Sequence, residues 1–168
     1  MVQPYSLFSL NQENNTMQRI CLFPGTFDPI TLGHVDVIER SVSLFDKLVI
    51  GVGINSSKQP MFSVEQRTDW MNEVFKNDPR IEITSYQGLT VDFCKQIGAN
   101  YILRGIRYVS DFEYEKAIAD MNRMLAPQIE TVFLTCSPQY STISSTLVRD
   151  VIRNGGNISL FVPSEVRF

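Results

Sequence analysis

Residues 20–34 read Ile-Cys-Leu-Phe-Pro-Gly-Thr-Phe-Asp-Pro-Ile-Thr-Leu-Gly-His, and they are the most informative part of the chain. Its apolar start predicts a buried strand, the Pro-Gly pair marks a tight turn, and the apolar spacing over residues 35–45 predicts one face of a helix. A turn between a strand and a helix lets backbone N–H groups and the positive helix end face one ligand, which favours phosphate. His34, the only histidine of the chain, stands at the start of that helix.

Strands and helices alternate along the rest of the chain. Apolar runs predict strands at residues 19–23, 47–53, 81–85, 101–104 and 131–135. Helical spacing predicts helices at residues 34–45, 64–75, 90–97 and 111–125, with a last one after Ser144. This alternation predicts an α/β fold with a five-stranded parallel sheet and helices on both of its faces.

Three helix ends carry local signals. Ser63 with Gln66 predicts a capping box for the second helix, and Ser110 with Glu113 predicts one for the fourth. Gly98 stands where a glycine should end the third helix.

Composition excludes several classes of protein. A net charge of −3 disfavours a broad basic surface for nucleic acid, and no apolar run approaches the roughly 20 residues of a membrane span. Three scattered cysteines and one histidine do not make a usual structural zinc site, and such free thiols are typical of a reducing, cytoplasmic location. Residues 1–16 lack the basic start of a signal peptide and are expected to form a flexible extension before a domain of residues 17–168.

Polar residues follow several predicted strands, at the edge where parallel sheets bind their ligands. They are Thr26, His34, Lys58, Arg104, Gly105, Arg107, Ser141, Thr142, Ser144, Ser145 and Thr146. The set contains cations, hydroxyls and one histidine, and it offers no convincing pair of nucleophile and base. It predicts a site that binds phosphate and stabilises charge by positioning.

Each of these residues also has a purely structural interpretation. A lone histidine usually caps or packs, and a loop lysine such as Lys58 is usually solvated. Two guanidiniums directly after one strand, Arg104 and Arg107, favour an anion site. Glu113 fits the helix dipole, whereas the role of Glu115 stays open.

The T-x-G-H ending of the opening turn is typical of nucleotidyltransferases, and over about residues 18–163 the chain resembles the bacterial phosphopantetheine adenylyltransferase family. The resemblance is carried by Phe-Pro-Gly-Thr-Phe-Asp-Pro-Ile-Thr-Leu-Gly-His at 23–34, Ser-Lys-Gln-Pro-Met-Phe at 57–62, Leu-Arg-Gly-Ile-Arg at 103–107, Asp-Phe-Glu-Tyr-Glu at 111–115, Met-Asn-Arg at 121–123 and Ile-Ser-Ser-Thr at 143–146. It implies a Rossmann-like fold and transfer of AMP from ATP to 4′-phosphopantetheine, giving dephospho-coenzyme A and pyrophosphate. It also implies Mg²⁺ as cofactor and a homohexamer.

The same resemblance implies roles for individual residues. The catalytic residues would be His34, Lys58 and Arg104. The residues that contact ATP would be Thr26, Phe27, His34, Gly105, Ile106, Arg107, Glu115, Tyr140, Ser141, Thr142, Ile143, Ser144, Ser145 and Thr146. The residues that contact the acceptor would be Thr26, Lys58, Leu89, Thr90, Arg104 and Asn122.

Three positions depart from the family pattern. Thr90 stands where many relatives carry an apolar residue, Gln59 where a second lysine is common, and Tyr140 where tryptophan is frequent. Three other functions share parts of the pattern: a nicotinamide mononucleotide adenylyltransferase, a cytidylyltransferase, and a nucleotide-binding module without turnover. The Asp-Phe-Glu-Tyr-Glu segment disfavours the first two, and the set of His34, Lys58 and Arg104 disfavours the third.

Overall fold

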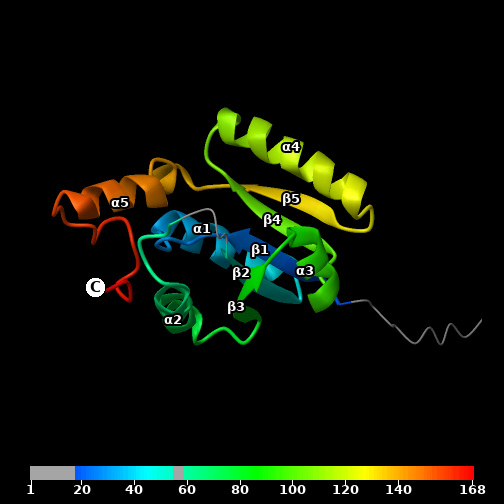
Figure 1. Ribbon diagram of the computed structural model, residues 1–168, viewed down its shortest axis with the longest axis horizontal. Helices are drawn as coiled ribbons and strands as arrows, with labels where there is room; N and C mark the ends of the chain where they lie inside the picture. The colour runs from blue at the N-terminus through cyan, green and yellow to red at the C-terminus, as the bar shows by residue number, and fades with distance from the viewer. Residues whose placement is uncertain (1–17, 55–58) are drawn as a thin grey trace, which may run out of the picture.

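The computed structural model describes residues 18–54 and 59–168, which form one sheet with helices on either side (Figure 1). The strands are β1 (Ile20–Gly25), β2 (Lys47–Ile54), β3 (Ile81–Gln87), β4 (Tyr101–Ile106) and β5 (Glu130–Thr135). Their order is β3-β2-β1-β4-β5, and every neighbouring pair is parallel. The five-stranded parallel sheet expected from the sequence is therefore confirmed.

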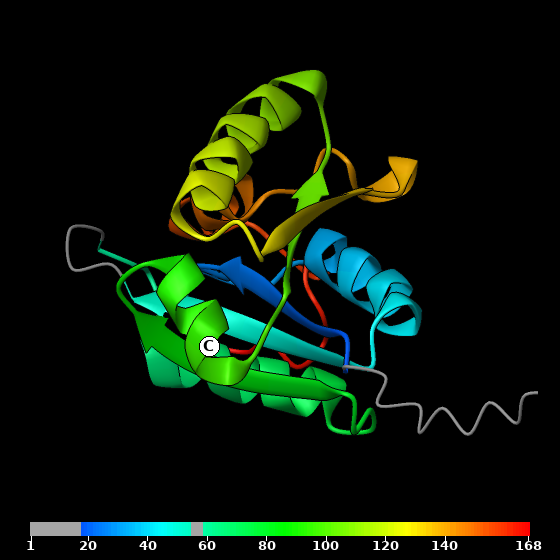
Figure 2. The ribbon, with the colours of Figure 1, turned by 90° about the vertical axis from the view of Figure 1, so that its right-hand side faces the viewer.

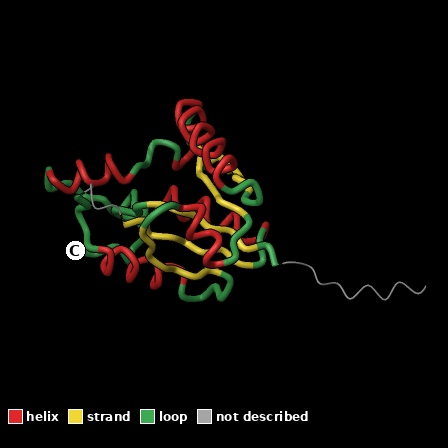
Figure 3. Tube along the Cα trace, turned by 45° about the vertical axis from the view of Figure 1, so that its right-hand side comes forward, coloured by secondary structure: helices red, strands yellow, loops and turns green. Residues whose placement is uncertain are grey.

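Helices connect each strand to the next, and a last helix follows the fifth strand. They are α1 (Leu32–Ser41), α2 (Val64–Phe75), α3 (Thr90–Ile97), α4 (Val109–Leu125) and α5 (Ser145–Arg153), with short 3-10 turns η1 (Val42–Leu44) and η2 (Pro138–Tyr140). Figure 3 shows the strands as a layer between helices. Because the chain runs outward from β1 to β3 and then returns across β1 to β4 and β5, right-handed crossovers place α1 and α2 on one face and α3 and α4 on the other.

The core follows the alternation of side chains along the strands. Cys21 and Phe23 of β1 pack in the larger cluster with α1, α2 and α5, whereas Leu22 between them packs against Val91 and Cys94 of α3. All five side chains are buried, so both faces of the central strand are covered.

Two helix ends agree with the sequence signals. The Ser63 hydroxyl accepts from the Gln66 N–H at 3.2 Å, and the Gln66 side chain accepts from the Ser63 N–H at 3.1 Å. Gly98 ends α3 with a left-handed backbone at φ 69°, a conformation that glycine adopts without steric cost.

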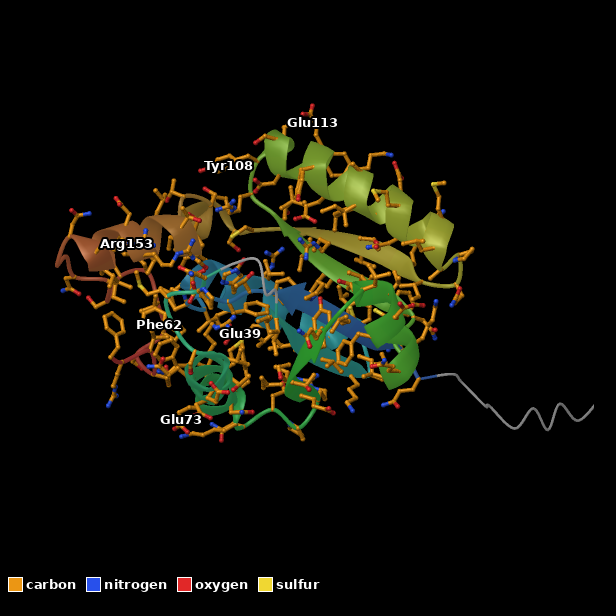
Figure 4. All side chains as sticks on the ribbon, in the orientation of Figure 1. Glu39, Phe62, Glu73, Tyr108, Glu113 and Arg153 are labelled. Atoms are coloured by element: carbon orange, nitrogen blue, oxygen red, sulfur yellow. The ribbon has the colours of Figure 1, made fainter. Side chains whose placement is uncertain are left out.

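The start of α4 differs from the expectation. The helix begins at Val109, and the Tyr108 carbonyl accepts from the backbone N–H groups of Asp111 and Phe112. Ser110 therefore lies inside the first turn, and the capping box predicted for Ser110 and Glu113 is wrong. Glu113 is exposed and points away from the body of the protein (Figure 4).

The sheet splits between its two central strands. β1 pairs with β4 only at Cys21–Tyr101 and Leu22–Ile102, although β1 stays paired with β2 to its last residue and β4 stays paired with β5 to its last residue. Figure 2 shows β4 turning away from β1 toward its carboxyl end. The split lies where the strand order reverses, which is the usual ligand site of such a sheet.

Among residues 18–54 and 59–168, no helix is both long enough and apolar enough to cross a bilayer. The proposed extension at residues 1–16 and the predicted catalytic Lys58 both lie outside the described residues.

Candidate active site

A pocket of about 1540 Å³ opens at the split between β1 and β4. Its walls come from the β1–α1 turn, the carboxyl half of β4 with the start of α4, the β3–α3 loop and the first turn of α5. The pocket therefore collects the ends of several strands, as the sequence predicted.

The turn after β1 is strained. Phe27 has a left-handed backbone with φ 49°, which is costly for a bulky side chain, and its buried ring lies edge-on against the His34 ring at 5.2 Å. A Cβ atom on Gly25 would lie 2.8 Å from that ring, so only glycine fits there. The turn leaves Thr26 exposed at the pocket wall.

His34 has a structural contact and a free ring nitrogen. Its Nδ1 accepts from the Thr31 N–H at 3.1 Å and lies 3.0 Å from the Thr31 hydroxyl, which closes a capping box for α1. Because Nδ1 accepts, the proton of the neutral ring is on Nε2. In the described part of the chain Nε2 has no hydrogen-bond partner, and His34 lines the pocket.

The ring of His34 is neutral at physiological pH. Burial, followed by the positive charges of Arg107 and Arg104, lowers the pKa of His34 to about 4. The structural interpretation of His34 as a cap is thus correct, and the cap itself sets the ring so that Nε2 can donate into the pocket.

Arg104 bridges the split of the sheet. Its Nη1 donates to the Pro24 carbonyl at 2.9 Å, while Nε and Nη2 donate to the two carboxylate oxygens of Glu115 at 2.6 and 2.5 Å. Three of its five N–H donors are used in this way, and two remain for a ligand. Glu115 was placed at the nucleotide by resemblance, and its contact in this structure is with Arg104.

Arg107 is held in a similar manner from the first turn of α4. Its Nε donates to Asp111 at 3.0 Å, and its backbone N–H donates to the same carboxylate at 3.2 Å. Arg104 and Arg107 both line the pocket, and both of their positive charges act on the ring of His34, so the two guanidiniums lie at one site.

The hydroxyl groups of residues 144–146 at the start of α5 have different partners. The Ser144 hydroxyl accepts from the Leu147 N–H at 3.2 Å and caps the helix, while Ser145 donates to the Pro29 carbonyl at 2.8 Å. Thr146 is exposed in the pocket and lies 3.2 Å from a guanidinium nitrogen of Arg149. Only Ser144 acts as the cap, so the other hydroxyls of this run are not needed to start the helix.

Several charged residues of the pocket wall were not identified from the sequence, among them Asp28, Arg67 and Arg149. Buried Asp28 accepts from the Met61 and Phe62 N–H groups, each at 2.9 Å, and its own carbonyl accepts from Arg149 at 2.6 Å. Arg67 is 2% exposed and donates to the Thr26 carbonyl at 2.6 Å. The only sequence signal was the presence of Asp28 within the opening turn.

Most of the residues chosen from the sequence line this pocket. They are Thr26, Phe27, His34, Thr90, Arg104, Gly105, Arg107, Glu115, Asn122, Ile143, Ser144, Ser145 and Thr146. Five others lie beside it without lining it: Leu89, Ile106, Tyr140, Ser141 and Thr142. Ile106 is buried in the sheet, and Leu89 is exposed just before α3.

No group of three or more histidine, cysteine or carboxylate side chains that could hold a metal ion occurs within the described ranges. The pocket carboxylates of Glu115, Asp111 and Asp28 are each bonded to arginine or to backbone N–H groups. The site therefore suits a metal ion that is held mainly by a ligand's own phosphates.

Comparison with known proteins shows the family of the chain. Residues 22–151 match the model of the family described as Cytidylyltransferase-like. The chain is 54% identical over 149 residues to a phosphopantetheine adenylyltransferase of Flavobacterium psychrophilum, covering 89% of this chain and 98% of that protein. It is 47% identical over 145 residues to a protein of the same name from Bacteroides fragilis, covering 86% of this chain and 96% of that protein.

A solved structure shows the same fold. It is a putative nicotinate-nucleotide adenylyltransferase from Vibrio parahaemolyticus, with a TM-score of 0.68 and 21% sequence identity, covering 89% of this chain and 90% of that chain. At this identity the likeness concerns the fold alone.

Proposed function

The chain belongs to the phosphopantetheine adenylyltransferases of the cytidylyltransferase-like family, and we propose how its pocket transfers AMP. The reaction takes AMP from ATP to 4′-phosphopantetheine and gives dephospho-coenzyme A and pyrophosphate, a step of coenzyme A biosynthesis. The observation that carries the mechanism is the capped ring of His34, whose Nδ1 accepts from the Thr31 N–H and which lines the same pocket as Arg104 and Arg107.

The reaction needs no general base. The second pKa of a phosphate monoester is about 6, so the attacking oxygen of the acceptor is already ionised near neutral pH. The pocket agrees with this chemistry, because Nδ1 of His34 is occupied by the Thr31 N–H and Nε2 carries a proton. His34 therefore donates a hydrogen bond and does not remove a proton.

The main obstacle is negative charge. Two polyanions must meet, and further charge develops on the α-phosphate as the new bond forms. We assign the α-phosphate to Nε2 of His34 and to Thr26, which the strained turn leaves exposed at the wall. Arg104, with two N–H donors remaining, receives the acceptor phosphate, and Arg107 with the start of α5 receives the triphosphate.

Magnesium is proposed as the cofactor on the chemistry of the donors. Since the pocket carboxylates are engaged, Mg²⁺ would be held mainly by the triphosphate oxygens, with the exposed Thr26 hydroxyl as a protein ligand. When bound, the ion neutralises charge on the phosphates and on the leaving pyrophosphate.

The activity has a direct test in pyrophosphate release. Purified protein with ATP, Mg²⁺ and 4′-phosphopantetheine should release pyrophosphate, and omission of the acceptor should stop the release. Chelation of the metal should also stop it. Release that does not depend on the acceptor would indicate hydrolysis of ATP and would contradict the assignment.

We also propose a homohexamer, supported by apolar side chains on the exposed face of α4. Val109 is 76% exposed and Met124 is 83% exposed, and Phe112, Met121 and Leu125 of the same helix are exposed between and beside them. Extended exposed apolar surface marks contacts between protein molecules. Light scattering should give about six times the chain mass of 19.2 kDa. Met124→Glu should lower this mass, while Leu160→Glu, at a residue 77% exposed after α5, should leave it unchanged. A monomeric wild type would refute the proposal.

A cytoplasmic location is proposed as well. Cys21, Cys94 and Cys136 are all free thiols, as is usual in a reducing compartment. The burial of Cys21 and Cys94 raises the pKa of each thiol, so these two side chains pack in the core and are unreactive.

A further inference from the structure

Arg67 is a buried charge at the wall of the pocket. It lies near the start of α2, is 2% exposed and still lines the pocket, and no role in the reaction has been given to it above. Burial lowers the pKa of Arg67, and the charges of Asp28 and Glu65 oppose this effect. A charge buried this deeply is costly unless its N–H groups are bonded, so the partners of the guanidinium indicate what it does.

The guanidinium joins two segments of the chain. Its Nε donates to the carbonyls of Phe62 and Ser63 at 3.1 and 3.2 Å, on the segment that leads into α2. Its Nη1 donates to the Thr26 carbonyl at 2.6 Å, in the turn after β1. One side chain therefore ties the turn that carries Thr26 to the start of α2.

The Thr26 carbonyl belongs to the peptide that enters the strained residue of this turn. Phe27 has φ 49°, and such a backbone persists only where the surrounding structure holds it. The Thr26–Phe27 peptide is trans, so its C=O and its N–H point in opposite directions. The bond to Arg67 therefore turns the Phe27 N–H away from the guanidinium, and within the described ranges this N–H has no hydrogen-bond partner.

Neighbouring carbonyls are held in the same way by other arginines. Three arginines from different elements each donate to one carbonyl of residues 24–28: Arg104 of β4 to Pro24, Arg67 of α2 to Thr26, and Arg149 of α5 to Asp28. The side chains of Arg104 and Arg149 are 25% and 22% exposed, so each can also meet a ligand. Arg67 is almost fully buried, which favours a contact with the turn over a contact with a substrate.

We propose that Arg67 is a positioning residue for the transfer, which holds the Thr26–Phe27 peptide so that the Thr26 hydroxyl and the Phe27 N–H face the α-phosphate in the transition state. Donors that are fixed before the reaction need no reorganisation when charge develops. The proposal rests on the proposed function, because that function gives the α-phosphate to Thr26. It assigns a buried arginine of α2 to the chemical step, through residues that it orients.

Two variants separate the hydrogen bond from the charge. Arg67→Met keeps the apolar stem and removes the donors, so kcat should fall by roughly 10- to 100-fold, the order of loss when a group at the reaction is misplaced. Arg67→Lys keeps the charge and loses the planar fork, so kcat should fall as well, by a smaller factor. KM for the acceptor and the calorimetric Kd for ATP should stay nearly unchanged, because the oriented donors act mainly on the transition state.

Ser63→Ala is the matched control for stability. It removes the side-chain cap of α2 beside Arg67 and leaves the donors of the guanidinium in place. Its melting temperature should fall through the loss of the cap, while its kcat should stay that of the wild type. A purely structural Arg67 would make Arg67→Met behave like this control.

A double variant tests whether Arg67 acts through Thr26. Thr26→Val removes the hydroxyl and keeps the shape, and combined with Arg67→Met it should lose less than the product of the two single losses. Fully multiplicative losses would overturn the proposal, as would a loss that lies wholly in KM for the acceptor or in Kd for ATP. Unchanged kcat in folded Arg67→Met and Arg67→Lys would also overturn it, and Arg67→Lys decides alone if the methionine variant does not fold. Absence of turnover in the wild type would instead refute the proposed function itself.

Discussion

Replacing His34 with alanine is expected to lower kcat by about 10²–10³-fold, the usual cost of removing one preorganised donor to a transition state. The reason is that Nε2 is set by the cap at Nδ1 and meets charge that develops only during the reaction. ATP binding should weaken far less, because the donor acts mainly on the transition state. Single-turnover rates and calorimetry of ATP binding on the same variant measure the two effects separately.

The capping box supplies the control for this variant. His34→Ala also removes the acceptor of the Thr31 N–H, a loss that costs roughly 0.5–2 kcal/mol of stability at a helix N-terminus. Glutamine is the usual partner in a capping box, so His34→Gln should restore the melting temperature and should not restore kcat. Recovery of the rate by glutamine, or collapse of ATP affinity with a normal chemical step, would contradict the role of donor.

The pKa of His34 adds a pH criterion to the same prediction. With a pKa of about 4, the ring loses its positive charge well below pH 6 and is neutral above that pH. The value of kcat/KM reports the ionisations of the free enzyme, so the ratio of wild type to His34→Ala should stay constant from about pH 6 to 8. A ratio that falls steadily across this range would mean that His34 itself titrates there and acts in its charged form.

The second large effect is expected at Arg104. Arg104→Lys keeps the positive charge and loses the fork, so KM for the acceptor should rise by roughly 10- to 100-fold, the usual cost of a hydrogen bond to a charged group. KM for ATP should change much less, because the remaining N–H donors are assigned to the acceptor phosphate. Equal losses for both substrates would place Arg104 on the nucleotide.

Glu115→Gln tests how Arg104 is positioned. The Glu115 carboxylate accepts from two N–H groups of Arg104, the Pro24 carbonyl accepts from a third, and two remain free. The neutral amide of a glutamine should hold the Arg104 guanidinium less firmly than the carboxylate does. We expect a smaller rise in KM for the acceptor than in Arg104→Lys, with KM for ATP nearly unchanged. A larger effect on ATP would instead support the place at the nucleotide that the family resemblance gave to Glu115.

Much of the fold could be read from local patterns. The opening strand, turn and helix, the α2 capping box and Gly98 all depend on residues within a few positions of one another, and the structure bears them out. The failure at Ser110 is also local. The helix α4 begins two residues before the predicted start at residue 111, because the Tyr108 carbonyl accepts the first backbone hydrogen bonds. A sequence signal for side-chain caps cannot indicate a helix start that uses the backbone alone.

The site was harder to predict where its contacts cross the sheet. The early end of the β1–β4 pairing depends on packing at the switch point, and nothing in either strand shows it. Arg104 meets Pro24 across 80 positions, and Arg67 meets Thr26 across 41. Patterns along the chain therefore identified which residues gather, whereas the partners that orient them required the tertiary structure.

A competition between acceptors tests the identity of the substrate. The wild type is given ATP, Mg²⁺ and equal concentrations of 4′-phosphopantetheine and nicotinate mononucleotide, and the products are identified by mass spectrometry. We expect dephospho-coenzyme A in amounts that match the pyrophosphate released, with no adenine dinucleotide. An adenine dinucleotide as the main product would contradict this expectation, and would place the chain with the function of the neighbour that shares its fold.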